Sequence, residues 1–162
     1  MIRRIPQRRR HAALLIEAAF VYPLLIFLIL MIIIGGMGVF RYQQVACQAR
    51  EAARWAGVRG SDWHKETGQA YPTKNDILQQ AVLPMAVGMP TNNITLQVMW
   101  IDQVTGQVVD WDAAPKHPLS VNASNQGVTN RVRVTVTYQW TPSLFLVGSI
   151  NLQSTCEIPM SF

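Results

Sequence analysis

One stretch of the chain, residues 12–40, is almost entirely apolar and carries a single charge, that of Glu17. From Ala18 to Val39 it contains no charged residue. A helix that crosses a bilayer needs roughly 20 apolar residues, and a core helix of a soluble protein is rarely so long or so uniformly apolar. The pattern therefore predicts a transmembrane helix over residues 13–40. Pro23 lies inside it and is expected to kink the helix, because proline has no backbone N–H.

The helix is predicted to continue beyond the apolar stretch as a stalk over residues 41–60. This segment has no proline, and no glycine before Gly57, and its small apolar residues recur at the spacing of one helix face. A helix over residues 13–59 would be about 70 Å long at 1.5 Å per residue. The face expected to be buried carries Ala46, Ala49, Ala53 and Ala56, with Tyr42 one step earlier, and the face expected to be wet carries Arg41, Gln44, Gln48 and Glu51.

Residues 61–162 carry turn signals and alternating strand patterns. Residues 60–75 are predicted to form a loop, and Asn75 to cap a short helix that ends near Pro84. The fold class predicted is α+β: a long N-terminal transmembrane and stalk helix followed by a small antiparallel β-sheet domain with one wet face. Strands are predicted over residues 93–101, 107–111, 131–140 and 150–160, the first two as a hairpin, and an exposed loop over residues 112–130.

The 162 residues include 14 Lys and Arg against 9 Asp and Glu, but the excess lies entirely at the N-terminus. Five arginines fall in the first ten residues, and beyond residue 10 cations and acids are equal in number. A basic leader before an apolar span places the N-terminus in the cytoplasm and residues 41–162 outside, in the periplasm or at the cell surface. The apolar run is too long for an ordinary cleaved secretory signal. Because a nucleic-acid-binding domain carries its Lys and Arg in the folded part, no nucleic-acid partner is expected.

No arrangement of residues predicts an enzyme. His64 and His117 stand in loops without zinc-ligand spacing, and no phosphate-binding glycine motif or nucleophile elbow occurs. Asp102, Asp110 and Asp112, around the predicted hairpin, are expected to be solvated loop acids. We therefore expect no catalytic, cofactor-binding or metal site and no small-molecule substrate.

The cysteines and tryptophans leave alternatives open. Cys47 on the stalk and Cys156 on the last strand are a candidate disulfide, because the outside compartment permits one; two buried thiols are the alternative. All five tryptophans follow the apolar stretch. Core or interface packing explains them without a ligand, and an aromatic patch for a partner is the alternative.

Glu17 needs an explanation, because an unpaired carboxylate in the apolar part of a membrane costs several kcal/mol. In one interpretation its side chain reaches the cytoplasmic interface near Arg9 and Arg10. In the other, a cation of another chain pairs with it. The second interpretation makes Glu17 an assembly residue.

Residues 8–23, RRRHAALLIEAAFVYP, resemble the start of TadE-like pseudopilins, minor pilin-type proteins of the tight-adherence (Flp) branch of type IV pilus systems. That start is a basic leader, a small residue, four mostly apolar residues, Glu, an apolar run and Pro six residues after the Glu; Ala12, Glu17 and Pro23 stand in this register. Residues 45–57, VACQAREAARWAG, are similar to the family's alanine-rich helix. Residues 143–160, SLFLVGSINLQSTCEIPM, are similar to its C-terminal strand.

The resemblance implies a non-enzymatic minor pseudopilin that takes part in assembling a type IVb (Flp) pilus or a related secretion filament, and so in tight adherence of bacterial cells. A prepilin-type peptidase would cut between Ala12 and Ala13, although the family usually has Gly where this chain has Ala12. Glu17 would then be the fifth mature residue and would pair with the N-terminal amine of a neighbouring subunit. The implied partners are membrane lipid, the peptidase, other pilin or pseudopilin subunits and the assembly platform at the inner (plasma) membrane.

The predicted organisation is a basic cytoplasmic leader over residues 1–12, a transmembrane helix over residues 13–40, a helical stalk over residues 41–60 and an extracytoplasmic α+β domain over residues 61–162. The alternative function is an uncleaved single-pass membrane anchor that presents the small β domain to an envelope partner. The two functions differ in measurable ways, because only the pseudopilin loses its arginine leader and depends on Glu17.

Overall fold

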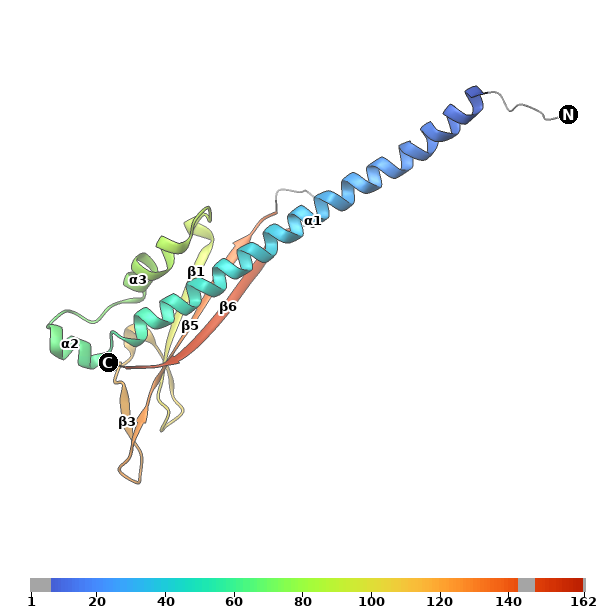
Figure 1. Ribbon diagram of the computed structural model, residues 1–162. Helices are drawn as coiled ribbons and strands as arrows, with labels where there is room; N and C mark the ends of the chain where they lie inside the picture. The colour runs from blue at the N-terminus through green and yellow to red at the C-terminus, as the bar shows by residue number, and fades with distance from the viewer. Residues whose placement is uncertain (1–6, 143–147, 162) are drawn as a thin grey trace. The chain divides into compact units, whose positions relative to one another are not determined.

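The computed structural model describes the backbone of residues 7–142 and 148–161 and the side chains of residues 14–142 and 148–161. The chain divides into two compact units, residues 1–39 and residues 40–162. The first contains the apolar part of a long helix. The second contains the end of that helix and an antiparallel sheet (Figure 1).

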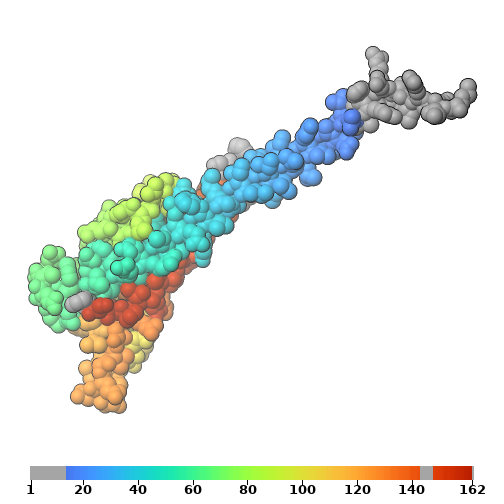
Figure 2. Space-filling view, viewed as in Figure 1, coloured from blue at the N-terminus to red at the C-terminus, as the bar shows by residue number. Residues whose placement is uncertain are grey.

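Helix α1 runs from Gln7 to Gly57 and passes through Pro23 without an interruption of its helical backbone. The long helix predicted over residues 13–59 is therefore confirmed, although it begins earlier and ends two residues sooner, at Gly57. In its first unit the large apolar side chains, blue in Figure 2, are exposed, with Leu15 at 71% and Phe20 at 77%. A contiguous apolar surface of this size requires lipid or another protein to cover it.

The part of α1 in the second unit buries one face. This confirms most of the predicted apolar row, whereas its first two members, Tyr42 and Ala46, are exposed and half-buried. The predicted wet face is wrong at Gln48, which is completely buried, with its Nε2 3.5 Å from the sulfur of Met89. The buried face is wider than the alanine row, because α1 is contacted by the segment before β1 as well as by the sheet. Its fully buried residues are Val45, Gln48, Ala49, Ala52, Ala53 and Ala56.

A four-stranded antiparallel sheet, in the order β2-β1-β5-β6, occupies the centre of the second unit. The short helix η3 (Thr91–Asn93) leads into β1, and β1 pairs with β2 as the predicted hairpin. β5 pairs with β1 on one side and with β6 on the other, and the three lie side by side in Figure 1. The four predicted strands are confirmed to within one residue at each end: β1 (Ile94–Ile101), β2 (Val108–Asp110), β5 (Arg131–Trp140) and β6 (Ile150–Pro159).

The two faces of the sheet differ in chemistry, as the alternation predicted. Val134, at the centre of the inner face, is completely buried. On the outer face Arg133 and Glu157 form an ion pair at 2.9 Å across β5 and β6, and the hydroxyls of Thr135 and Thr155 lie 2.9 Å apart. Cross-strand pairs contribute about 0.2–1 kcal/mol each. The wet face thus helps to fix the register of β6.

The end of β6 returns to the end of α1. The amide of Ser161 donates a 2.9 Å hydrogen bond to the carbonyl oxygen of Gly57. A Cβ on Gly57 would lie 2.9 Å from Cδ1 of Ile158, closer than such atoms approach. The absence of a side chain at Gly57 therefore allows this contact between helix and strand.

The loop predicted over residues 60–75 is wrong in its first half, which forms helix α2 (Ser61–Thr67). Asp62 lies in its first turn and pairs with Lys65 at 2.8 Å. An acid near a helix N-terminus and an oppositely charged pair three residues apart both favour a helix. Gly68 ends α2 in the left-handed conformation, with φ of 66°.

Helix α3 (Lys74–Ile77) continues into η1 (Leu78–Val82) and η2 (Leu83–Met85), which confirms the short helix predicted before Pro84. Its N-cap is Thr73, and the prediction of Asn75 is wrong. Thr73 Oγ1 accepts a hydrogen bond from the amide of Asp76, and the Asp76 carboxylate accepts one from the amide of Thr73 at 2.8 Å. This reciprocal pair is a capping box.

The loop predicted over residues 112–130 is wrong in part, because it contains a second, two-stranded sheet. Helix η4 (Trp111–Ala113) precedes the hairpin of β3 (Leu119–Val121) and β4 (Gly127–Thr129). Asn122 shapes its turn, with Oδ1 accepting from the amides of Ser124 and Gln126. Figure 2 shows these residues, in orange, standing out from the rest of the second unit.

Candidate functional site

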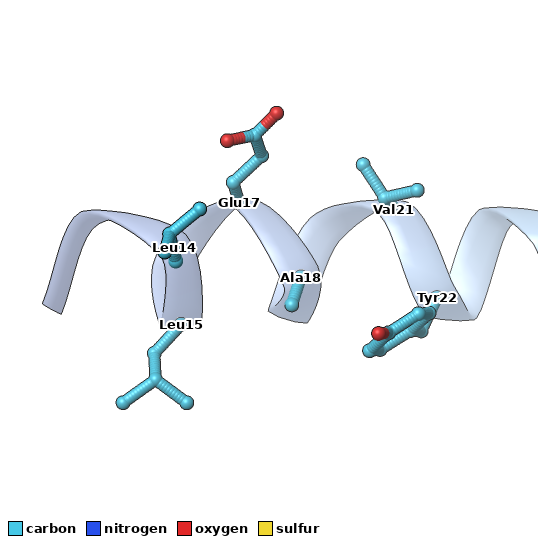
Figure 3. A pocket seen from close by; sticks show the side chains of 6 residues that line it. All are labelled: Leu14, Leu15, Glu17, Ala18, Val21 and Tyr22. Carbon is cyan, nitrogen blue, oxygen red and sulfur yellow. The ribbon is translucent and has the colours of Figure 1, made fainter. Parts of the chain in front are cut away.

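Glu17 lies on the exposed surface of α1, in a shallow hollow between the side chains of that one helix (Figure 3). Its carboxylate points away from the helix, and Val21 lies on the same side, because residues four apart share a helix face. Leu15 and Tyr22 point to the opposite side. The other residues that line the hollow are apolar or aromatic: Leu14, Leu15, Ala18, Val21 and Tyr22.

Among the side chains described, Glu17 forms no ion pair. The sequence from Leu14 to Phe40 contains no cation, so a partner must come from the residues before this stretch or from another molecule. The side chains of Arg9 and Arg10 lie outside the described residues, and pairing with them stays a prediction. An unpaired buried charge costs several kcal/mol, and a cation beside Glu17 would remove that cost when lipid or protein covers this surface.

The predicted cleavage point lies within the helical backbone of α1, between Ala12 and Ala13. Their side chains, and the leader arginines Arg3 and Arg4, lie outside the described residues, and the cleavage stays a prediction. In helical geometry four residues rise about 6 Å, so a new amine on Ala13 would lie one turn from Glu17.

Pro23 stands six residues after Glu17, within continuous helix. Since proline has no N–H, the carbonyl oxygen of Ala19 has no donor from its own helix. In lipid such a carbonyl must be satisfied by a neighbouring group. The predicted kink itself stays a prediction.

The two cysteines are free thiols, so the candidate disulfide between Cys47 and Cys156 is not formed. Cys47 is exposed on α1, which also corrects the alternative of two buried thiols. Cys156 is half-buried, on the inner face of β6 opposite Val134.

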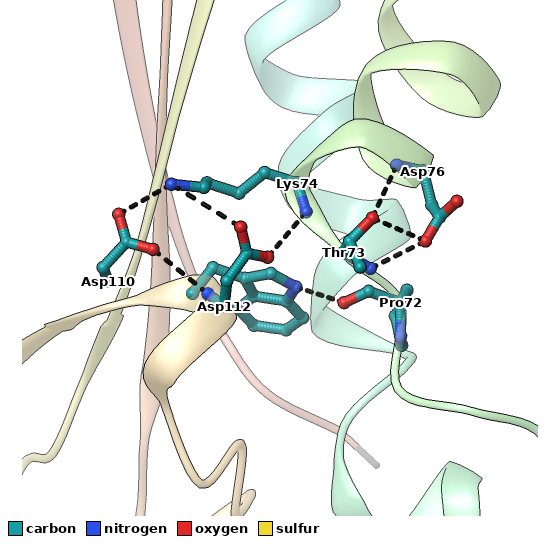
Figure 4. A network of polar contacts seen from close by, with 7 residues as sticks. Pro72, Thr73, Lys74, Asp76, Asp110 and Asp112 are labelled. Carbon is teal, nitrogen blue, oxygen red and sulfur yellow. Dashed lines mark hydrogen bonds and ion pairs between the residues drawn. The ribbon is translucent and has the colours of Figure 1, made fainter.

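Two of the three predicted loop acids bind a lysine (Figure 4). Lys74 Nζ donates to Asp110 at 2.9 Å and lies 3.6 Å from Asp112, and the amide of Lys74 donates to Asp112 at 2.9 Å. The hydrogen bond between Lys74 and Asp110 lowers the pKa of the carboxyl and raises the pKa of the ammonium. These contacts join the start of α3 to η4, which is a structural role.

The remaining candidates also have local partners. Asp102 accepts hydrogen bonds from the amides of Val104 and Thr105 and so shapes the turn between β1 and β2. His64 donates to the carbonyl oxygen of Gln69, and His117 bonds to the hydroxyl of Ser61 at 3.3 Å. Within residues 14–142 and 148–161, no three His, Cys, Asp or Glu side chains are grouped as a metal site would require.

Lys116 was missed by sequence reasoning. It is 5% exposed, with its Nζ 5.3 Å from the ring centre of Tyr71 and 5.4 Å from that of Trp111. Burial removes water from the ammonium and lowers its pKa. In the sequence, the only structural signals next to Lys116 are prolines, which predict a loop. A predicted loop gives no indication that its lysine is buried.

The described residues define a class of protein: an α+β chain in which a long apolar N-terminal helix precedes a small antiparallel sheet. By length and composition, the part of α1 from Leu14 to Gly57 is a candidate membrane span. Comparison with known proteins gave no relative: no family model, no curated protein and no solved structure matches the chain. The chain's own residues are therefore what supports a function.

Proposed function

We propose that the protein is a non-enzymatic minor pseudopilin of the TadE-like kind, which takes part in assembling a type IVb (Flp) pilus or a related secretion filament. The observation that carries the proposal is a single carboxylate, Glu17, exposed without an ion-pair partner among the described residues on an otherwise apolar helix. It stands in register with Ala12 and Pro23. A helix that only anchors a protein in lipid gains nothing from such a charge. A helix that packs against another subunit can use the charge to form an ion pair with that subunit.

Processing would supply the missing cation. A prepilin-type peptidase that cuts after Ala12 removes all five leader arginines and creates an ammonium on Ala13. In a filament this amine pairs with Glu17 of a neighbouring subunit, and each charge removes the cost of burying the other. The apolar side chains around Glu17 then pack against neighbouring helices instead of lipid. Before assembly the helix resides in the inner membrane, with the leader in the cytoplasm and residues 41–162 outside.

The first test is the mature N-terminus, determined by mass spectrometry of protein isolated from its native membrane. The proposal predicts a chain that begins at Ala13. A chain that still carries Arg3 to Arg10 would overturn it. That result would favour an uncleaved single-pass anchor that presents the β-sheet unit to an envelope partner.

The second test separates assembly from insertion. Glu17→Gln keeps the shape of the side chain and removes its charge, and Glu17→Ala removes both. Glu66→Gln, at an exposed acid of α2, is the matched control. We expect both Glu17 variants to insert into the membrane normally and to be lost from sheared filaments, while Glu66→Gln is incorporated as the unaltered chain is. Incorporation of both Glu17 variants at the unaltered level would exclude the pairing.

A further inference from the structure

A second hollow lies wholly within residues 40–162, between the end of α1, helix α2 and the start of α3 and η1. Its volume is about 490 Å³, which is within the range of small-ligand sites, roughly 300–1,000 Å³. The end of α1, helix α2 and helix α3 lie close together at one end of the second unit in Figure 1. The side chains that carry its chemistry are Trp55, Arg59, Trp63, Gln69, Asp76 and Gln80.

Two of the chain's five tryptophans wall this hollow and are half-buried, whereas Trp100, Trp111 and Trp140 belong to the core. The Arg59 guanidinium lies 4.0 Å from the ring centre of Trp55 and donates to the Trp55 carbonyl oxygen at 3.2 Å. Arg59 and the indole of Trp55 therefore hold each other in place. An ordered aromatic wall offers contact area at low entropy cost.

The hollow is lined by hydrogen-bond donors and hydrogen-bond acceptors that are not already used by partners within the described residues. Among the described residues, the amides of Gln69 and Gln80 and the indole N–H groups of Trp55 and Trp63 make no side-chain hydrogen bond. Asp76 uses Oδ2 for the Thr73 cap, which leaves Oδ1 as an acceptor. The hydrogen bonds from Thr73 hold the pKa of Asp76 below its ordinary value, so this acceptor is ionised at neutral pH.

The charges and residue types exclude several ligand classes. Arg59 and Asp76 compensate each other, and a single arginine already stacked on an indole is a poor site for a phosphate. One carboxylate without histidine or cysteine cannot hold a transition metal. A lipid tail would leave the glutamine amides unpaired, which costs about 1–3 kcal/mol for each buried group.

We propose that this hollow binds a neutral saccharide of one or two rings. Each sugar hydroxyl both donates and accepts a hydrogen bond, which matches the two glutamine amides, the indole N–H groups and the Asp76 carboxylate. The C–H face of a sugar ring packs on an indole, and Trp63 supplies that surface because the guanidinium of Arg59 already covers a face of Trp55. The site lies wholly within residues 40–162 and does not depend on the proposed role of Glu17.

The test uses the full chain in nanodiscs of phosphatidylcholine, because maltoside and glucoside detergents carry sugars that would fill the site. The probes are the disaccharides maltose, cellobiose and N,N′-diacetylchitobiose, and binding is followed by saturation-transfer NMR and tryptophan fluorescence. We expect at least one probe to bind with a Kd of about 1 mM or tighter. Trp63→Ala should weaken that binding about tenfold or more, and Gln80→Ala about threefold to tenfold.

Gln79→Ala is the matched control, because Gln79 is exposed beside Gln80 and does not line the hollow. It should bind the probe as the unaltered chain does. If Trp63→Ala fails to fold, comparing the sugar affinity of Gln80→Ala with that of Gln79→Ala still tests the proposal. The proposal is overturned if none of the three probes binds, if both glutamine variants bind equally, or if inorganic phosphate binds at the hollow more tightly than every sugar.

Discussion

The indole N–H of Trp111 donates a 2.8 Å hydrogen bond to the carbonyl oxygen of Pro72, and both residues are buried (Figure 4). The bond ties the start of α3 to η4 beside the ion pairs of Lys74. Because water cannot replace the indole there, this contact should matter more to stability than the exposed ion pairs around it.

Trp111→Phe should lower the free energy of unfolding by about 2–4 kcal/mol, because it leaves a buried acceptor unpaired and a cavity beside it. The measurement is chemical unfolding of the full chain in detergent, followed by circular dichroism. Trp55→Phe is the control, since its indole N–H makes no bond among the described residues, and it should cost less than about 1 kcal/mol. Equal losses in the two variants would refute the importance of the hydrogen bond.

Thr73→Ala should cost about 1 kcal/mol, because Thr73 caps α3 and holds the carboxylate of Asp76. Asn75→Ala should change stability by no more than about 0.5 kcal/mol, because Asn75 is exposed inside the first turn. Thermal melts of the two variants against the unaltered chain test this directly. A larger effect at Asn75 than at Thr73 would contradict the observed cap.

Glu157 should give the sheet a measurable dependence on pH. Burial raises the pKa of this carboxyl, but hydrogen bonds and positive charge from Arg133 and Arg131 outweigh it, so the pKa lies below its ordinary 4.5. A lowered pKa contributes stability that is present above pH 4.5 and is lost as the pH falls through the folded-state value.

Glu157→Gln should therefore destabilise the protein by up to about 1 kcal/mol at neutral pH, since the pair is partly exposed, and by less as the medium becomes acidic. The free energy of unfolding of both chains is measured across this pH range. A difference that stays constant with pH would rule out the ionised pair.

Gln48→Met should stabilise the protein by about 1 kcal/mol. Oε1 of Gln48 is buried and makes no hydrogen bond with any residue that the structure describes, and burying such a group costs free energy. Methionine has nearly the same shape and no polar atom. Gln43→Met, at an exposed position of the same helix, should change stability little. A lower melting temperature for Gln48→Met would show that Oε1 has a partner in the folded protein.

The elements with a strong period were predictable from sequence, and those that depend on local polar contacts were not. β5 alternates Val132, Val134 and Val136 with polar residues, so its bounds and its inner face could be read directly. α2 has no apolar face, and its helix depends on a terminal glycine and on the Asp62–Lys65 pair. Such short-range interactions each contribute less than about 1 kcal/mol, and they produce only a weak pattern in the sequence.

The same division holds for the candidate site. Glu17 could be identified because a single charge within an apolar stretch is visible in the sequence without knowledge of the fold. Gln48 was predicted on the wet face because its side chain is polar, and that prediction was wrong. Its burial depends on Met89, which lies far along the chain and cannot be inferred from the helix sequence. Lys116 and the hollow beside Trp63 exist only once distant segments pack together, so no local spacing predicts them.

The contact between Gly57 and Ser161 has a consequence for how the protein is made. The helix leaves the ribosome early, whereas β6, which covers the free edge of β5 and reaches back to Gly57, is synthesised after the other described strands. Pairings so distant in sequence form slowly, and until they form the chain presents an open strand edge. A chain that stops before Ile150 would keep that edge permanently. The edge of β5 is covered only after β6 has been synthesised, and a chain terminated before β6 would leave that edge accessible to proteases.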